Sequence, residues 1–542
     1  MTRYRGLCLL VLVGALALRL WNACSLLPAD FYYEERWYVP IAYCMGDGDL
    51  NPHYFVNPSL FTYLLFGVDV AWYLVGRLLG VFRDAADFQA LFHAYPTAFC
   101  TAARCLAAVC GSAGVGMAML IARRLFGRPA AAVAGILLAL APLHASMSGW
   151  GLNDALAATV GLTASWLALK DRWTLAFLAA GLALGTKYAQ SATVIGILVS
   201  AGWTHRDRRW LPPVLKGLLL VLAGFLLVNP YVVLDFAGFR AELSAGAGSE
   251  TNPIWKIRPE SSFFYYSRSL VAGASPAFFL LGGLGLVLAV RRSWMGRSLP
   301  LWFPAAWLMA VMYAHVPQNA RYLLPAVAVL CIFAGGAAQD LWERVRLRPG
   351  APLLALLFLP LLCAPALAQD LRHARMVHLK STLEEAREWV EAHVPSGSVL
   401  LTDSYTGDFP SEAPTKALGP LHLRGYCMTP DREPLRSRIR ARWKGRSYVL
   451  YQMYDHLGAL PWQGIPRPAY LVTANWTSAW VRHSARAYPP SRGELEFYDR
   501  LFEEGRLLTV LSPEDSFLDE TVWDDDLKFS AAVRTGFRRP GP

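Results

Sequence analysis

The chain has few charged residues for its length. Asp, Glu, Lys and Arg make up 17% of its 542 residues, whereas hydrophobic residues make up 55%. A soluble enzyme does not need so many apolar residues, so the composition excludes an ordinary soluble protein and favours one that crosses a membrane several times. The basic residues also form no stripe interleaved with stacking aromatics, so no nucleic acid is expected as a partner.

The chain also lacks the cysteine and repeat patterns of other classes. Its nine cysteines include no CxxC pair, so a zinc cluster is not expected. Most of them lie in apolar runs, where cysteine behaves as a small hydrophobic residue. Cys24 and Cys44 flank an acidic loop and could form a disulfide on an oxidising side of the membrane. No internal repeat and no low-complexity tract occurs.

What the chain does contain is a series of apolar runs long enough to cross a bilayer, for which about 20 residues are needed. They cover 6–23, 98–122, 129–147, 153–169, 173–188, 189–204, 211–229, 265–290, 299–315, 321–341 and 351–368. A poor cleavage site follows the first run, so we expect it to be a retained signal anchor.

Clusters of basic residues fall in every second connection between these runs. They are Arg3 and Arg5; Arg123, Arg124 and Arg128; Lys170 and Arg172; Arg206, Arg208 and Arg209; Arg291, Arg292 and Arg297; and Arg344, Arg346 and Arg348. Basic residues mark the cytoplasmic side of a membrane protein. If a further run over 60–82 crossed the membrane, every later cluster would change sides. We therefore expect this run to lie along the outer surface, with Asp69 and Arg77 in water.

The predicted fold is a polytopic α-helical membrane protein of about eleven transmembrane helices with a C-terminal soluble α/β domain. Residues 1–370 form the transmembrane domain, and its first outer loop is 24–97. Strand patterns at 398–403, 446–453 and 468–475 alternate with helix patterns over 371–525 and predict the soluble domain. Residues 526–542 are expected to be loosely ordered. The first loop and the soluble domain face away from the cytoplasm.

Acidic and aromatic side chains gather in the stretch 30–58, and other outer connections add polar residues at the same face. The set comprises Glu34, Glu35, Asp47, Asp49, His53, His144, Asn153, Asp154, Lys187, Tyr188, Asn229, Asp235, His315, Asn319, Arg321 and Tyr322. A carboxylate can take a proton from a hydroxyl nucleophile, and cations can stabilise a departing lipid phosphate. Transfer of a sugar from a polyprenyl phosphate needs both.

Several short segments occur in a characteristic order. They are Glu34-Glu35, Gly48 to His53, Pro58 to Leu60, Arg123 to Gly127, Pro142 to His144, Asp154, Thr186 to Tyr188 and Arg321 to Pro325. This order resembles the GT-C glycosyltransferases, in particular the protein O-mannosyltransferase and aminoarabinose-transferase-like group (family 39 and its RgtA/B/C/D-like relatives). Two positions depart from the pattern: Glu34 stands where Asp is usual, and the segment SGWGLN before Asp154 lacks an expected Arg.

The resemblance implies an inverting enzyme that moves a sugar from a polyprenyl-phosphate donor to a hydroxyl of a lipid, glycan or protein. Glu35 or Glu34 would be the base, assisted by Asp154. Lys187, Arg321 and Tyr322 would bind the donor phosphate. Asp49, His53, Asn153 and Tyr188 are candidates for contacts with the acceptor or the sugar. The expected location is a bacterial inner membrane, with the site on the periplasmic face and membrane lipid around it.

Other interpretations remain open at this stage. Asp154 could cap a helix, Lys187 could extend its amine from a span end to the interface, and Arg321 could anchor a span at the interface. A transporter or flippase of a lipid-linked sugar is an alternative, although it would place ionisable residues near span midplanes. A metal-dependent oligosaccharyltransferase-like enzyme is another. No cofactor is assigned, and only Asp47 and Asp49 offer carboxylates for a divalent metal.

Overall fold

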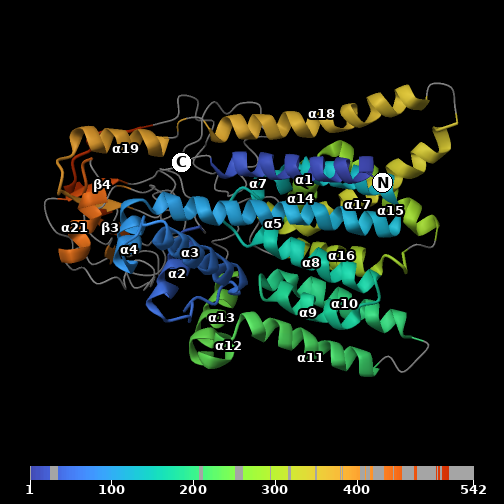
Figure 1. Cartoon of the computed structure of the whole chain (residues 1–542), viewed down its shortest axis with the longest axis horizontal. Coiled ribbons are helices and arrows are strands. Elements are labelled where there is room, and N and C mark those ends of the chain that lie inside the picture. Colours follow the sequence, from blue (N-terminus) through green and yellow to red (C-terminus); the bar gives the residue numbers. More distant parts are fainter. Residues whose placement is uncertain are drawn as a thin grey trace.

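The computed structural model describes residues 2–24, 35–206, 211–250, 261–292, 295–314, 319–347, 351–378, 380, 382–402, 409, 416–418, 433–442, 445–453, 469–472, 496, 499–500 and 503–511. Most of these residues are helical. Long helices run side by side, with the N-terminus at one end of the bundle and the C-terminal strands at the other (Figure 1). The two ends are called here the N-terminal end and the sheet end.

Apolar runs become helices because a helix satisfies its own backbone hydrogen bonds inside a membrane. The bundle contains α1 (Thr2–Ala23), α5 (Pro96–Leu125), α6 (Arg128–Ala139), α8 (Asp154–Leu169), α9 (Trp173–Leu184), α10 (Ser191–Thr204), α11 (Leu211–Val228), α14 (Ser262–Ala274), α15 (Pro276–Arg291), α16 (Leu299–Ala314), α17 (Leu324–Val345) and α18 (Ala351–Val377). The polytopic α-helical class is therefore confirmed.

Among the described helices, five are long and apolar enough to cross a bilayer. They lie at Tyr4–Ala23, Leu60–Leu78, Pro96–Leu125, Leu211–Val228 and Ala320–Val345. A sixth results if α14 and α15 are counted together. The expected total of about eleven spans stays a prediction, since several other apolar helices are shorter than 18 residues.

Two apolar runs are broken where the sequence places proline. The run 265–290 was expected to be continuous, but α14 and α15 meet at an angle of 101°. Ser275 has a positive φ of 77° at this break, and Pro276 opens the next helix. The run 129–147 is likewise divided into α6 and α7 (Pro142–Met147). Proline has no N–H to continue the preceding helix, whereas its fixed φ suits the first helical turn.

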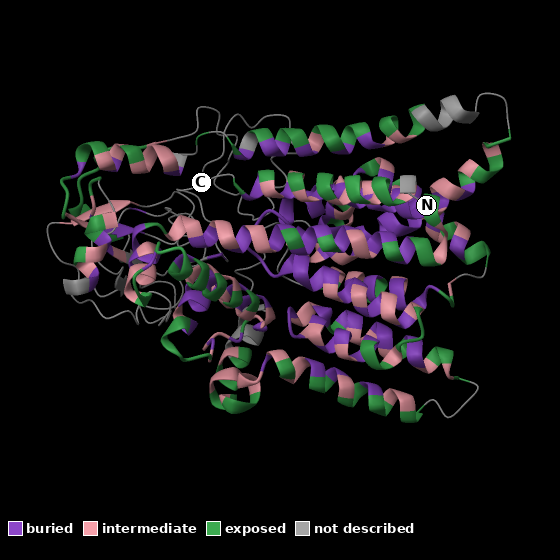
Figure 2. Cartoon of the chain, in the orientation of Figure 1, coloured by how far each residue is buried: buried purple, intermediate pink, exposed green. Residues whose placement is uncertain are grey.

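The bundle interior is closely packed, and its central helices carry the largest share of buried residues (Figure 2). Small residues allow this packing. A Cβ at Gly285 of α15 would lie 2.1 Å from the carbonyl oxygen of Phe333 in α17. Only glycine permits so close an approach of two helix backbones, as is common where membrane helices pack.

Further elements cover the sheet end. They are α2 (Glu35–Cys44), the 3₁₀ turn η1 (Met45–Asp47), α3 (Leu60–Leu78), α4 (Ala85–Ala94), α12 (Tyr231–Leu234) and α13 (Phe236–Glu250). Figure 1 shows α3 beside α2 and α4 at this end. Arg77 of α3 is exposed, as expected, but the expectation that Asp69 lies in water is wrong, because Asp69 is only 3% exposed. Asp69 is on the face of α3 that packs inward with Phe61 and Leu65.

The C-terminal part contains a four-stranded parallel sheet of order β2-β3-β1-β4. Its strands and helices are α19 (Thr382–His393), β1 (Val399–Thr402), β2 (Lys416–Leu418), α21 (Glu433–Arg442), β3 (Val449–Met453) and β4 (Ala469–Val472). Three strands lie in segments that the sequence marked as strands, whereas β2 was not foreseen. The limits of the soluble domain stay a prediction, and the tail 526–542 lies outside the described residues.

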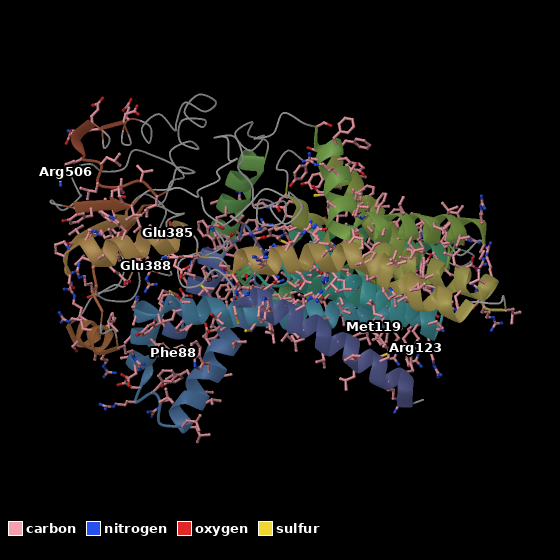
Figure 3. The ribbon with its side chains drawn as sticks, turned by 90° about the horizontal axis from the view of Figure 1, so that it is seen from above. Phe88, Met119, Arg123, Glu385, Glu388 and Arg506 are labelled. Carbon is pink, nitrogen blue, oxygen red and sulfur yellow. The ribbon has the colours of Figure 1, made fainter. Side chains whose placement is uncertain are left out.

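Helix α21 attaches this part to α4. Its Leu435 and Ile439 pack on Ala90 and Ala94 of α4. Arg438 forms ion pairs with Asp84 and with Asp87, the latter at 3.1 Å. The hydrogen bond that Arg438 donates to Asp84 is the main reason why the pKa of Asp84 is lowered. In Figure 3, Phe88 of α4 and Glu385 and Glu388 of α19 lie toward the sheet end, whereas Arg123 lies toward the N-terminal end.

Candidate functional site

Glu35 forms the first of two buried ionic clusters at the sheet end. It is the first residue of α2, and its side chain and that of Arg104 in α5 are both 0% exposed. Arg104 Nε donates to Glu35 Oε1 at 2.7 Å, and Nη2 donates to Oε2 at 2.8 Å. The backbone N–H of Gly151 also donates to Oε1, at 2.6 Å. Glu35 is therefore a fixed carboxylate that joins α2, α5 and the connection before α8.

The surroundings of this pair explain how it is enclosed. The Arg104 guanidinium lies 4.5 Å from the ring centroid of Trp150, a cation–π geometry. A Cβ at Gly151 would lie 3.2 Å from Glu35 Oε1 and 2.9 Å from the Cβ of Ala103. Glycine at this position thus lets the backbone approach both helices. Buried charges need such partners, because an isolated one would be strongly destabilising.

Asp154 forms the second cluster. Lys187 Nζ donates to Asp154 Oδ1 at 2.5 Å, and Arg321 Nε lies 3.8 Å from Oδ2. The three side chains are 3%, 10% and 4% exposed for Asp154, Lys187 and Arg321. The ring of Tyr322 lies 4.7 Å from Lys187 Nζ and 5.7 Å from the Arg321 guanidinium. Two cations and one carboxylate of the described part of the chain therefore meet in this cluster.

Short turns aim both cations at Asp154. Lys187 follows the end of α9 and precedes the 3₁₀ turn η2 (Tyr188–Gln190). Arg321 lies in η4 (Ala320–Leu323), where the side chain of Asn319 accepts from Arg321 N at 3.3 Å. Asn153 donates through Nδ2 to the carbonyl of Thr186 at 2.8 Å, which fixes the start of α8 against the Lys187 turn.

The connection from Trp150 to Asp154 links the two clusters. Gly151 contacts Glu35, and Asp154, three residues later, contacts Lys187 and Arg321. Carboxylates and cations from distant parts of the sequence therefore meet at one end of the bundle. Among the described residues Asp154 makes ion pairs rather than a side-chain cap, and Lys187 and Arg321 are buried rather than extended into water.

A third group lies on the loop between η1 and α3. His53 Nε2 is 2.9 Å from Asp49 Oδ2, and His53 Nδ1 is 3.5 Å from Asp235 Oδ2. Tyr188 donates its hydroxyl to the carbonyl of Phe55 at 3.0 Å, so the loop lies next to the Lys187 turn. Burial, with the nearby charge of Glu242, raises the pKa of Tyr188 to about 12. Its hydroxyl therefore stays protonated at neutral pH and can donate.

Some residues that the sequence assigned to the site lie elsewhere in the structure or outside the described residues. Glu34 and His315 lie outside the described residues. His144 is fully buried, and its Nδ1 lies 2.8 Å from Arg19 Nη2 of α1. No disulfide joins Cys24 and Cys44 in the structure. In the part of the chain that the structure describes, no three His, Cys, Asp or Glu side chains form a metal-binding group.

The sequence interpretation missed Arg104 and Trp150. A signal for Arg104 was present, because it is a charged residue inside the apolar run 98–122, and such a residue usually faces a partner in the bundle interior. No comparable signal marks Trp150 in a chain with 19 tryptophans. Only the fold shows that its ring covers the Arg104 guanidinium.

Residues 87–233 match the family model of dolichyl-phosphate-mannose-protein mannosyltransferases. This match confirms the resemblance to GT-C glycosyltransferases, and it includes Arg104, Asp154 and Lys187. No curated protein matches the chain.

Two solved structures of membrane transferases match this chain at low sequence identity. ArnT from Cupriavidus metallidurans bound to undecaprenyl phosphate is 17% identical with a TM-score of 0.46, over 70% of this chain and 72% of that one. The oligosaccharyltransferase AglB from Archaeoglobus fulgidus, in complex with an inhibitory peptide and a dolichol-phosphate, is 13% identical with a TM-score of 0.46, over 73% of this chain and 62% of that one. Such values do not by themselves establish a common fold.

Proposed function

We propose that the protein is a glycosyltransferase that moves a sugar from a polyprenyl phosphate to a hydroxyl acceptor. The observation that carries this proposal is the buried cluster in which two cations, Lys187 and Arg321, both lie beside the Asp154 carboxylate. A lipid phosphate gains negative charge as the sugar leaves. Preorganised cations in a site with little water stabilise that charge more strongly than exposed ones would.

Each residue of this cluster has a separate role in the proposal. Lys187 and Arg321 bind the donor phosphate, and Tyr322 packs beside both. Asp154 orients the two cations before the donor arrives and prevents their mutual repulsion. Asn153 keeps Asp154 against the Lys187 turn through its bond to Thr186. Asp49, His53 and Tyr188 are close enough to this turn to contact the sugar or the acceptor.

The general base is assigned to Glu34 rather than Glu35. Both carboxylate oxygens of Glu35 already accept hydrogen bonds, two from the Arg104 guanidinium and one from the Gly151 backbone, so neither is placed to take a proton from a hydroxyl. Glu35 is also 0% exposed, so an acceptor hydroxyl cannot reach it without a rearrangement. We assign Glu35 to positioning, since it anchors the start of α2. A single base without a covalent intermediate gives inversion at the anomeric carbon.

The proposed setting is a bacterial inner membrane, with the sheet end on the periplasmic side. Support comes from the basic residues at the N-terminal end, which the positive-inside rule assigns to the cytoplasm. Arg123, near the N-terminal end in Figure 3, and Arg3 and Arg5 belong to these clusters. The acceptor would then be a lipid, glycan or protein hydroxyl outside the cytoplasm.

The test uses membranes that contain the full chain and a panel of labelled polyprenyl-phosphate sugars. We expect one or more donors to yield transferred sugar. Arg321→Gln and Lys187→Gln should each lower the transfer rate about 10²–10³-fold, as the loss of one charge-stabilising group typically does. Arg344→Gln is the matched control, because Arg344 is 61% exposed near the other end of α17. Equal rates in all three variants would contradict the phosphate site.

The base assignment has its own test. Glu34→Gln should abolish transfer while the protein remains folded, whereas Glu35→Gln should reduce both transfer and thermal stability. The assignment is wrong if Glu34→Gln transfers at the normal rate, whatever the rate of Glu35→Gln. A transporter would instead move the labelled lipid across the bilayer without attaching its sugar to an acceptor.

A further inference from the structure

A pocket of about 640 Å³ lies at the N-terminal end of the bundle, away from the Asp154 cluster. It is lined where α5, α8 and α10 end and where α9 and α16 begin. Asp154 starts α8 and the pocket residue Leu169 ends it, so the two sites are about 22 Å apart at 1.5 Å per residue. The proposed transfer reaction does not use this pocket.

The lining of the pocket is basic and aromatic. Arg124, Arg206 and Arg297 contribute three guanidinium groups, and Asp171 is the one acidic residue among the described side chains of the lining. Arg206 lies 4.4 Å from the ring centroid of Trp203, which is itself 53% exposed. Arg124 Nε donates to the carbonyl of Leu169 at 3.4 Å. The arginines therefore come from three different connections and surround one space.

The positive-inside rule explains why arginines occur at this end but not why these three line a common pocket. Arg123 and Arg128, from the same turn as Arg124, instead lie 6.0 and 5.8 Å from the ring of Tyr4. Arg344 pairs with Asp340 at 2.9 Å. Arg123, Arg128 and Arg344 thus contact partners that do not line the pocket, whereas Arg124, Arg206 and Arg297 line it.

We propose that this pocket binds the phosphate headgroup of an anionic membrane lipid in the leaflet at the N-terminal end. Guanidinium groups bind phosphate oxygens in a fork geometry, and basic pockets between helix ends on the cytoplasmic side are suited to such headgroups. Trp203 supplies the amphipathic ring that is common at the depth of lipid headgroups. The pocket opens among helix ends, where the acyl chains of a lipid can remain in the bilayer beside the helices.

The experiment compares the full chain with two triple variants in detergent. One carries Arg124→Gln, Arg206→Gln and Arg297→Gln. The control carries Arg123→Gln, Arg128→Gln and Arg344→Gln, which removes the same charge from the same end. Retained phosphatidylglycerol is counted by native mass spectrometry, and the thermal midpoint is measured as phosphatidylglycerol is added. Phosphatidylcholine and inorganic phosphate form the comparison arms.

The wild type and the control should retain phosphatidylglycerol, and the pocket variant should need about tenfold more of it for the same thermal shift, as expected when charge-assisted contacts are removed. Equal losses in both triple variants would overturn the proposal, because only the overall charge would then matter. Equal shifts with phosphatidylcholine, or with inorganic phosphate at the same concentration, would overturn the lipid assignment. If the pocket triple does not fold, Arg297→Gln alone is compared with Arg344→Gln, and equal retention would count against the pocket.

Discussion

Arginine has different surroundings at the two ends of the bundle. At the sheet end Arg104 and Arg321 are 0% and 4% exposed, and each lies beside a buried carboxylate. At the N-terminal end Arg123, Arg124 and Arg206 are exposed, with aromatic rings or backbone carbonyls as neighbours. The same side chain is therefore part of a buried ionic site at one end and of a charged surface at the other.

This difference separates two uses of positive charge in a membrane protein. An exposed arginine contributes to orientation in the membrane, and its loss changes stability little, because water and lipid headgroups solvate the charge. A buried arginine must have a partner at a fixed distance, so its loss also leaves that partner uncompensated. Burial beside a carboxylate, rather than residue type or local sequence, distinguishes Arg104 and Arg321 from the exposed arginines.

The largest expected effect comes from breaking the buried pair at the sheet end. Arg104→Leu leaves the Glu35 carboxylate buried without its guanidinium, and it should destabilise the protein by about 3–5 kcal/mol. Thermal unfolding in detergent measures this. The double variant with Glu35→Leu should recover most of the lost stability, because two apolar side chains can replace a buried ion pair. A double variant as unstable as Arg104→Leu would show that the pair is not the cause.

A smaller loss of stability is expected at the same end when the pH falls. Burial lowers the pKa of His93 in α4 to about 4 from 6.5, so the neutral imidazole is favoured in the folded chain. The unfolded chain binds the proton more readily between these values, so stability is full above pH 6.5 and falls as the pH approaches 4. At pH 5 the loss should be about 2 kcal/mol relative to pH 7.

Hydrogen exchange of the α4 amides at both pH values measures this loss locally. His93→Phe removes the titrating group and keeps a ring beside Tyr43 and Phe92, which both lie near His93. The pH dependence of α4 exchange should then become flatter. An unchanged pH dependence in this variant would assign the effect to another group.

The smallest effect is expected at the N-terminal end. Arg123→Gln should change the free energy of unfolding by no more than about 0.5 kcal/mol, since Arg123 is exposed. The same thermal unfolding assay applies. A loss comparable to that of Arg104→Leu would remove the distinction between the two ends.

The candidate site could be predicted in part. Short motifs named Asp154, Lys187 and Arg321, and the alternation of basic clusters placed their connections on one side of the membrane. The structure brings these three side chains together. The enclosure of Glu35 could not be predicted, because adjacent residues in a loop have no periodicity to show which one faces the interior. That enclosure depends on Arg104, 69 positions away.

The sequence by itself determined the membrane class and the apolar runs that become helices, because both follow from hydrophobicity summed over local stretches. It also marked the segments that form β1, β3 and β4. Only the tertiary structure decided that Glu35 is enclosed by Arg104 and Gly151, that Asp69 is buried, and that three arginines share one pocket. These features depend on how helices distant in the chain pack together, and packing creates contacts that no local pattern records.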